Sequence, residues 1–240
     1  MERGFLIKFN NLRDDAEFIF SVITSIYNAE NFLKESIESV INQTIGFEGN
    51  VQLILIDDGS TDNSKNIALD YFNKYPNNIV FLSIPNQGQG NARNIGLDYV
   101  KGEFVNFLDA DDYLSENALM EVYNFFNKHV DIIDVVSIPL ILFGRSAGPH
   151  RLNYKYKNNE VIKLSEKPNN PQLSASSAFI RSSAIGDLRF SDKVISSEDS
   201  IFINKILLKK RAYGVINTAE YYYRQRFDQS STIDSSIYDK

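Results

Sequence analysis

Residues 51–62 read VQLILIDDGSTD, a run from Val51 to Ile56 that is apolar except for Gln52 and ends in a turn of acids, glycine and hydroxyls. Such a run is typical of a strand buried on both faces of a parallel sheet. The segment after it carries Ala68, Phe72 and Tyr75 at helical spacing. The stretch therefore predicts a strand, an acidic turn at the carboxyl end of that strand, and a helix.

The same strand–helix unit recurs on both sides of this stretch. Strands are expected at residues 20–24, 79–84 and 104–108, and helices at 33–41, 91–100 and 119–126. Asn28 and Ser115 are expected to cap the first and last of these helices. Repeated units of this kind predict an α/β fold with a mostly parallel central sheet and helices on both faces.

After about residue 144 the pattern becomes less regular. A helix beginning at Ser197 and strands at 212–217 and 221–224 are still expected. We therefore expect an N-terminal extension at 1–17 and a single domain at 18–240. Within that domain, residues 18–112 are expected to form a nucleotide-binding half and residues 113–240 an acceptor-side half. The polar ending at 230–236 is consistent with a fragment of a longer protein.

Composition excludes several classes of protein. A net charge of -6 argues against a nucleic-acid-binding domain, which normally has a basic face. The absence of cysteine excludes disulfides and cysteine zinc sites, and two histidines leave little for a histidine metal cluster. Any chemistry must therefore use mainly carboxylates, amides, hydroxyls and arginines.

The sequence also lacks the usual signals for secretion or membrane insertion. Charges are scattered through the first 18 residues, unlike a signal peptide. The most apolar stretch, 135–143, is broken by Ser137 and Pro139 and is far shorter than the ~20 residues that span a bilayer. We therefore expect a soluble, cytoplasmic protein.

Polar clusters follow three of the expected strands. They are Tyr27-Asn28, Asp57-Asp58 and Asp109-Ala110-Asp111-Asp112. Each cluster taken alone could be a turn former. Together they would meet at one edge of the sheet, where carboxylates repel each other unless a cation lies among them. Oxygen ligands without histidine or cysteine favour Mg²⁺ or Mn²⁺ bridging to phosphates.

Residues 85–96, PNQGQGNARNIG, are similar to a phosphate-binding loop only in part. The third glycine of a dinucleotide fingerprint is replaced by Arg93, and no P-loop motif is present. The glycines instead indicate a tight turn that lets Arg93 face the crevice. The alternative is a glycine-rich helix start with no further role.

Two later features can be interpreted in two ways each. Glu198 and Asp199 stand at an expected helix start, where one acid would serve as a cap and the other could act as a general base. Arg224 and Arg226 would share one face of a strand and could bind a phosphate, although such a run is often only an alternating strand.

The ordered motifs resemble the family 2 glycosyltransferases of the GT-A fold. The resemblance covers residues 18–228 and rests on five motifs in the order of that family. These are Tyr-Asn at 27–28, Asp-Asp-Gly-Ser-Thr-Asp at 57–62, Asn-x-Gly-x-Gly-x-Ala-Arg-Asn-x-Gly at 86–96, Asp-Ala-Asp-Asp at 109–112 and Glu-Asp at 198–199. A weaker similarity, at 42–47 and in the Tyr/Arg-rich tail, is to bacterial enzymes that build teichoic acids and capsules.

The resemblance implies roles for individual residues. Asp57 would accept a hydrogen bond from uracil, with Tyr27 and Arg93 beside the base. Asp109 would face the ribose or the sugar, and Asp111 would bind the Mn²⁺ or Mg²⁺ that bridges the diphosphate. Asp199 would deprotonate the acceptor hydroxyl.

The sequence also departs from the family pattern. Ser25 stands where the family usually has proline, at the edge of the nucleotide pocket. Some members supply a late histidine near the diphosphate, a region where this chain has Arg224, Arg226 and Ser230. Glu198, beside the expected base, is also expected to bind substrate.

The resemblance thus implies an inverting, metal-dependent hexosyl- or N-acetylhexosaminyltransferase. It would use a UDP-sugar donor and a glycan, polyol-phosphate or lipid-linked acceptor, in cell-surface polysaccharide or teichoic acid synthesis. Peripheral association with the inner face of the membrane is a further expectation. Two alternatives remain open, a nucleotidyltransferase and a non-catalytic sugar-nucleotide or glycan-binding domain. A nucleotidyltransferase should carry a glycine-rich phosphate loop and a lysine after the first strand, and neither is present here.

Overall fold

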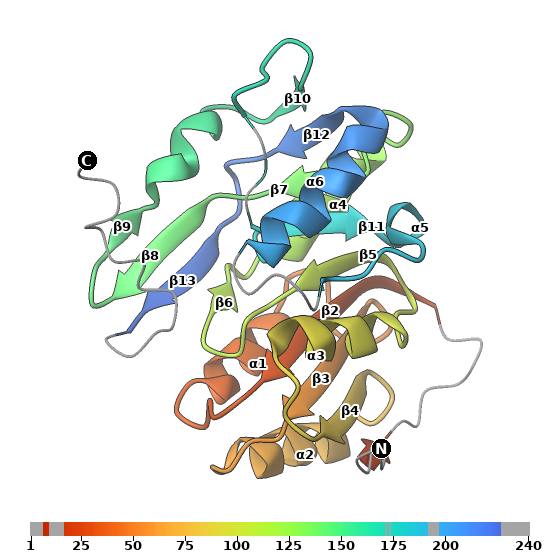
Figure 1. Ribbon diagram of the computed structural model, residues 1–240, viewed down its shortest axis with the longest axis vertical. Coiled ribbons are helices and arrows are strands. Elements are labelled where there is room, and N and C mark those ends of the chain that lie inside the picture. Colours follow the sequence, from red (N-terminus) through yellow and green to blue (C-terminus); the bar gives the residue numbers. More distant parts are fainter. Residues whose placement is uncertain (1–6, 10–16, 171, 173, 192–196, 227–240) are drawn as a thin grey trace.

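The computed structural model describes residues 7–9, 17–170, 172, 174–191 and 197–226. Within them, a nine-stranded central sheet lies beside a smaller four-stranded sheet (Figure 1). The apolar side chains of the strands and helices form two clusters, one on each face of the central sheet. This is the layered α/β arrangement that the sequence predicted.

Four parallel strands form the N-terminal part of the central sheet. In spatial order they are β4 (Ile79–Ile84), β3 (Val51–Asp58), β2 (Phe18–Ile26) and β5 (Gly102–Phe107). Every residue of β3 and β4 is buried. Because both faces of these strands are covered, their sequences are mostly apolar rather than alternating between apolar and polar residues.

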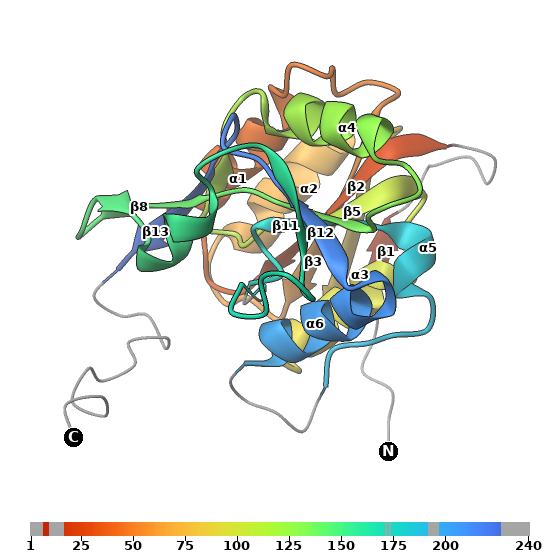
Figure 2. The same ribbon diagram turned by 90° about the horizontal axis from the view of Figure 1, so that it is seen from above.

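Helices cover both faces of this sheet. They are α1 (Leu33–Ile41), α2 (Ser64–Lys74), α3 (Gln89–Leu97), α4 (Ala118–Lys128), the single turn α5 (Ser182–Ile185) and α6 (Glu198–Lys210). Phe20 and Val22 of β2 pack in the cluster with α1, α2 and α4, whereas Ile23 packs with α3, α5 and α6. Figure 2 shows α1, α2 and α4 on one side of the strands and α3 and α6 on the other. In the described part of the chain, each helix is too short or too polar to cross a membrane.

The C-terminal part of the central sheet mixes strand directions. Its strands are β11 (Ala178–Arg181), β7 (Val135–Ser137), β12 (Ala212–Val215) and β10 (Glu160–Lys163). β11 is antiparallel to both β5 and β7, whereas β12 is parallel to β7. At the opposite edge, β1 (Ile7–Phe9) pairs antiparallel with β4. Part of the expected N-terminal extension is therefore a strand of the central sheet.

The second sheet brings the C-terminal strand beside the acidic motif. It consists of β6 (Tyr113–Leu114), β13 (Tyr221–Gln225), β8 (Leu140–Gly144) and β9 (Gly148–Pro149), and a 3-10 helix, η1 (Arg151–Lys155), follows β9. β13 runs antiparallel to β6 and parallel to β8. Because β6 directly follows Asp109–Asp112, this pairing brings β13 next to that motif.

The two predicted helix caps were wrong. Asn28 has a φ of 48° and accepts a hydrogen bond from the Thr61 N–H (2.8 Å), while α1 begins only at Leu33. Ser115 donates to Oδ1 of Asn117 (3.0 Å), and Asn117 is the residue that precedes α4. Asn28 therefore joins two loops at the strand ends instead of starting a helix.

Candidate active site

The carboxyl ends of β3, β2 and β5 lie side by side, because these strands are neighbours in the sheet. In the β2–β3 register, Ile26 lies opposite Asp57. Ser25 is buried one residue earlier, and Tyr27 is 54% exposed just beyond the strand. The tertiary structure thus brings the first two predicted clusters to one edge of the sheet, where ligands of open α/β sheets bind.

Asp57 is held rigidly at the end of β3. One carboxylate oxygen accepts a hydrogen bond from the Ser60 N–H (3.1 Å) and the other from the Ser83 hydroxyl (2.9 Å). A carboxylate offers about four acceptor positions. Asp57 therefore keeps capacity to accept a further hydrogen bond from a ligand.

Asp58 has a positioning role that the sequence analysis missed. Its two carboxylate oxygens accept hydrogen bonds from the backbone N–H groups of Gln87 and Gly88, both at 2.8 Å. Gly88 has a φ of 91°, a conformation that favours glycine. Asp58 thus fixes the start of the glycine-rich segment that leads into α3.

Arg93 of α3 lies at the centre of the site and is 2% exposed. It donates to Oδ1 of Asp199 (2.5 Å) and to Oδ1 of Asp109 (2.8 Å). Burial lowers the pKa of Arg93, but the two carboxylates outweigh that effect and raise this pKa above its ordinary value. The side-chain hydrogen bonds of Arg93 are therefore with acids of the site, and its guanidinium lies over the rings of Phe107 and Phe190. The resemblance placed Arg93 beside the base.

Asp109 connects three segments of the chain. It accepts hydrogen bonds from Gln89 (2.8 Å) and from the Ser176 hydroxyl (3.3 Å) in addition to Arg93. Burial is the main influence on its carboxyl and raises its pKa; Arg93 opposes this, and Asp199 adds to it. Gln89 and Ser176 were missed, because nothing in their local sequence distinguishes them from other polar residues.

Asp199 stands on the second residue of α6, as predicted. Besides the contact with Arg93, its carboxylate accepts a hydrogen bond from the Ala175 N–H (3.3 Å). Within the described residues, both hydrogen-bond partners of this carboxylate belong to other segments and neither is an amide of α6. Glu198 is half-buried beside it, and the hydrogen bonds of the Arg93 cluster do not include Glu198.

Asp111 and the arginines of the C-terminal strand also meet. The Arg224 Nε donates to the backbone carbonyl of Asp111 (2.8 Å), and the Arg226 Nε lies 3.1 Å from the Asp111 carboxylate. Both guanidinium groups lie over the ring of Phe32, at 4.7 and 5.2 Å from its centroid. The two arginines that were expected to share one face of the strand thus both contact Asp111. Ser230 lies outside the described residues.

A buried network beneath the acidic motif was not predicted. The Tyr221 hydroxyl donates to Asp112 (2.8 Å) and accepts from the Asp109 N–H (3.2 Å). Asp112 also accepts from the Arg224 N–H (2.8 Å), and burial, aided by Asp109, raises the pKa of its carboxyl well above the ordinary range. The network ties β13 to the turn that carries Asp109 and Asp111.

The residues at Asp111 fit a divalent cation only in part. Over the described ranges, no three His, Cys, Asp or Glu side chains are grouped to hold a metal ion by themselves. Mg²⁺ is commonly bound by one or two carboxylates together with substrate phosphates. Asp111, a carboxylate 16% exposed beside two arginines, fits that mode of binding.

Comparisons with known proteins identify the family and the relatives of this chain. The family described as Glycosyl transferase family 2 matches residues 21–189. The chain is 42% identical over 217 residues to the Bacillus subtilis minor teichoic acid biosynthesis protein GgaB, covering 90% of this chain and 24% of GgaB. It is 41% identical over 228 residues to GgaA of the same organism, covering 92% of this chain and 50% of GgaA. It thus spans half or less of the length of these relatives.

A solved structure shows the same fold. Staphylococcus aureus TarS 1-349 in complex with UDP-GlcNAc superposes with a TM-score of 0.76 at 27% identity, over 88% of this chain and 59% of the TarS chain. This similarity confirms the predicted GT-A fold. From its motifs, its fold and the match over residues 21–189, the chain belongs to glycosyl transferase family 2.

Proposed function

We propose that this chain is an inverting glycosyltransferase domain that moves a sugar from a UDP-sugar to a hydroxyl of a glycan or polyol-phosphate acceptor. The observation that carries the proposal is the placement of Arg93 between Asp109 and Asp199 at the strand ends. The buried guanidinium of Arg93 thereby links Asp109, on the donor side, to Asp199, on the expected acceptor side.

Asp199 is the proposed general base. Its carboxylate is oriented from two sides, by Arg93 and by the Ala175 N–H, rather than by its own helix. This arrangement favours the catalytic interpretation over the capping one, because a cap would bond the first amides of α6. A carboxylate held in this way can accept the proton of a hydroxyl nucleophile.

The reaction would be a single displacement. The acceptor oxygen forms a bond to C1 of the sugar while Asp199 takes its proton, and the bond from C1 to the diphosphate oxygen breaks. UDP leaves with the electron pair of that bond. Attack from the side opposite the leaving group inverts the configuration at C1.

The leaving diphosphate would lie near Asp111, Arg224 and Arg226. Guanidinium groups bind phosphate oxygens through charged hydrogen bonds. A divalent cation held by Asp111 would neutralise the charge that develops on the diphosphate. Arg226 pairs with Asp111, so we expect donor binding to exchange this contact for contacts with the diphosphate.

The uridine would bind at the ends of β2 and β3. Asp57 can accept a hydrogen bond from the uracil N3–H, and the exposed ring of Tyr27 can pack on the base. Ser25 lies at the edge of this pocket. The TarS structure with UDP-GlcNAc supports a UDP-sugar donor, and the names of GgaA and GgaB support a role in teichoic acid synthesis.

The proposal is tested by UDP release from a panel of UDP-, CDP- and GDP-sugars with Mn²⁺, using glycan and polyol-phosphate acceptors. Asp199→Asn should lower kcat on the order of 10²–10⁴-fold, because the amide cannot accept a proton. Calorimetric UDP affinity should stay close to that of the parent. The melting temperature should fall, because the buried Arg93 loses one of its two carboxylate partners, so kcat is measured below the unfolding transition. Asp187→Asn, an exposed acid elsewhere, is the matched control. If turnover of Asp199→Asn stays within a few-fold of the parent, Asp199 is not the base.

A further inference from the structure

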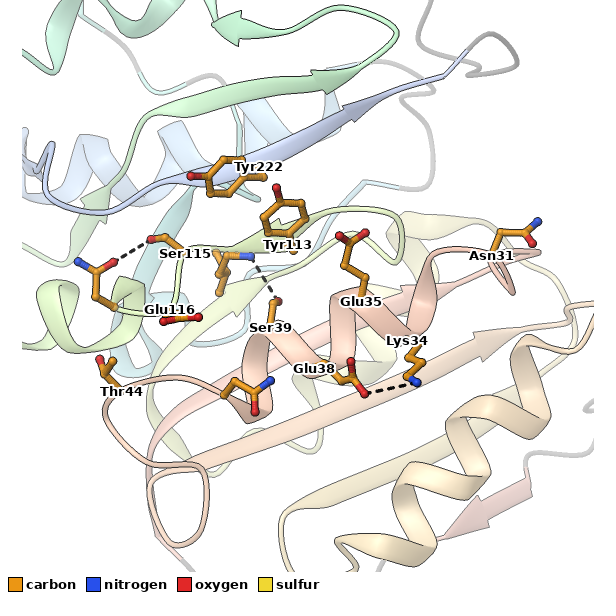
Figure 3. Close-up of a pocket in the computed structure, with 13 residues that line it drawn as sticks. Asn31, Lys34, Glu35, Glu38, Ser39, Thr44, Tyr113, Ser115, Glu116 and Tyr222 are labelled. Atoms are coloured by element: carbon orange, nitrogen blue, oxygen red, sulfur yellow. Dashed lines mark hydrogen bonds and ion pairs between the residues drawn. The ribbon is translucent and has the colours of Figure 1, made fainter.

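A cavity of about 840 Å³ lies between α1 and the second sheet, outside the Arg93 cluster (Figure 3). Its walls come from α1 and the residues at its two ends, from β6 and the turn that follows it, and from β13. The lining residues include Asn31, Glu35, Asn42, Tyr113, Glu116 and Tyr222.

The cavity adjoins the proposed catalytic site. Tyr113 on its wall follows Asp111 by two residues. Glu35, also on its wall, forms an ion pair with Arg224, and the Arg224 Nε donates to the Asp111 carbonyl (2.8 Å). A single arginine side chain therefore contacts both the cavity wall and the acidic motif.

The wall combines aromatic rings with unused polar groups. The rings of Tyr113 and Tyr222 are stacked, with centroids 4.5 Å apart and an interplanar angle of 13°. Among the described residues, the side chains of Asn31 and Asn42 and the hydroxyl of Tyr113 form no hydrogen bond with another part of the protein. Amides and hydroxyls both donate and accept hydrogen bonds, so this wall can bind a ligand that carries many hydroxyls beside apolar C–H surface.

The charge of the wall disfavours an anionic ligand. Three glutamates, Glu35, Glu38 and Glu116, line the cavity with one lysine, Lys34, and Arg224 pairs with Glu35, so three acids face two cations. The ammonium of Lys34 already lies 3.9 Å from Glu38. A surface with an excess of negative charge repels phosphate groups.

We infer that this cavity binds an uncharged saccharide segment of the acceptor chain, at a distance from the hydroxyl that reacts. The inference rests on the proposed function, because that function is what makes the saccharide a part of the acceptor. Binding of the saccharide does not itself require turnover, so it can be measured separately.

The test is an NMR titration of the ¹⁵N-labelled 240-residue chain, reading the side-chain amides of Asn31 and Asn42 in the parent and the backbone amides of the cavity residues in every protein. Maltotetraose and chitotetraose are the neutral probes, and a ribitol-phosphate oligomer of similar length is the anionic probe. A neutral probe should shift these amide signals. The double variant Asn31→Ala/Asn42→Ala should weaken its binding on the order of tenfold, through loss of about two hydrogen bonds. Asn73→Ala, exposed on α2 and outside the cavity, should bind like the parent.

Two results would overturn the inference. The first is that neither neutral probe shifts these amides in the parent, or that the double variant binds the neutral probes as tightly as the parent does. The other is that the ribitol-phosphate oligomer binds through the same amides at least as tightly. Calorimetric UDP binding is measured on every variant. A parent that neither binds UDP nor releases it from a UDP-sugar would count against the proposed function. A parent that binds UDP normally while its cavity binds no neutral probe would count against this inference alone.

Discussion

Residues 18–112 present their candidate acids at the ends of parallel strands and Arg93 from α3, whereas residues 113–226 present theirs from a helix start, a loop and the second sheet. The Asp57 carboxylate is bonded by Ser60, three residues away, and by Ser83 on the adjacent strand. Asp199 reaches Arg93 across 106 residues, and Tyr221 reaches Asp112 across 109.

The difference shows where the site depends on folding of the whole domain. The N-terminal side is positioned by the parallel sheet itself, because strands that are adjacent in the sheet end at a common edge. The C-terminal side is positioned by individual polar contacts that join distant segments. Disturbing those contacts should uncouple the two sides while leaving the parallel sheet in place.

The largest expected effect concerns Asp111, where the two regions meet. Asp111→Ala should lower turnover on the order of 10³-fold, since a bound cation contributes several kcal/mol of transition-state stabilisation. UDP affinity should fall as well. A coupled assay of UDP release, with and without EDTA, makes the measurement. EDTA should reduce the parent to the rate of the variant and leave the variant unchanged. A parent whose turnover and UDP affinity are both insensitive to EDTA would contradict metal dependence.

A second test compares two arginines, Arg93 and Arg189, whose ion pairs join the two regions and differ in burial. Arg93→Met leaves Asp109 and Asp199 without their cation, so the free energy of unfolding should fall by about 3 kcal/mol. The control is Arg189→Met, which removes an exposed pair with Asp98 and should cost less than about 1 kcal/mol. Urea unfolding curves of both variants provide the comparison. Equal losses would mean that burial of Arg93 has no special role in joining the regions.

A third prediction concerns the N-terminal region alone. CDP should bind more weakly than UDP by roughly 1–3 kcal/mol, because cytosine has no N3–H to donate to Asp57. Asp57→Asn should remove this preference, since an amide can donate as well as accept. Calorimetry with both nucleotides tests it. A parent that binds UDP and CDP equally would show that Asp57 does not discriminate between uracil and cytosine.

The smallest effect lies in the C-terminal region, at Lys155 of η1. Burial lowers the pKa of Lys155 to about 8, while its Nζ donates to Gln172 (2.6 Å). Between that pKa and the unfolded value of about 10.4, the unfolded chain binds more protons, so stability rises with pH. From pH 7 to pH 9 the contribution of Lys155 to the free energy of unfolding should increase by about 1 kcal/mol.

Urea unfolding of the parent and of Lys155→Met at both pH values isolates this contribution. The parent should gain stability relative to the variant as the pH rises. A difference between the two proteins that is the same at pH 7 and at pH 9 would show that Lys155 titrates as an ordinary exposed lysine.

Much of the N-terminal region could be predicted from its residues. The strand at 79–84 has the predicted bounds, and those at 20–24 and 51–56 extend by two residues at one or both ends. Continuous apolar runs and helical spacing identify such elements without knowledge of their neighbours. The caps at Asn28 and Ser115 were wrong because an Asn or Ser near a helix start can equally bond another loop.

The sequence by itself determined the order of strands and helices, the family and the acids at the strand ends. These follow from hydrophobic periodicity and from motifs whose residues are near one another in the chain. Only the tertiary structure decided that Arg93 lies between Asp109 and Asp199, that Tyr221 supports Asp112, and that a cavity opens beside α1. The contacts of Arg93 with Asp199 and of Tyr221 with Asp112 join residues more than a hundred positions apart. Their geometry depends on how the strands of two sheets pair, which local patterning does not specify.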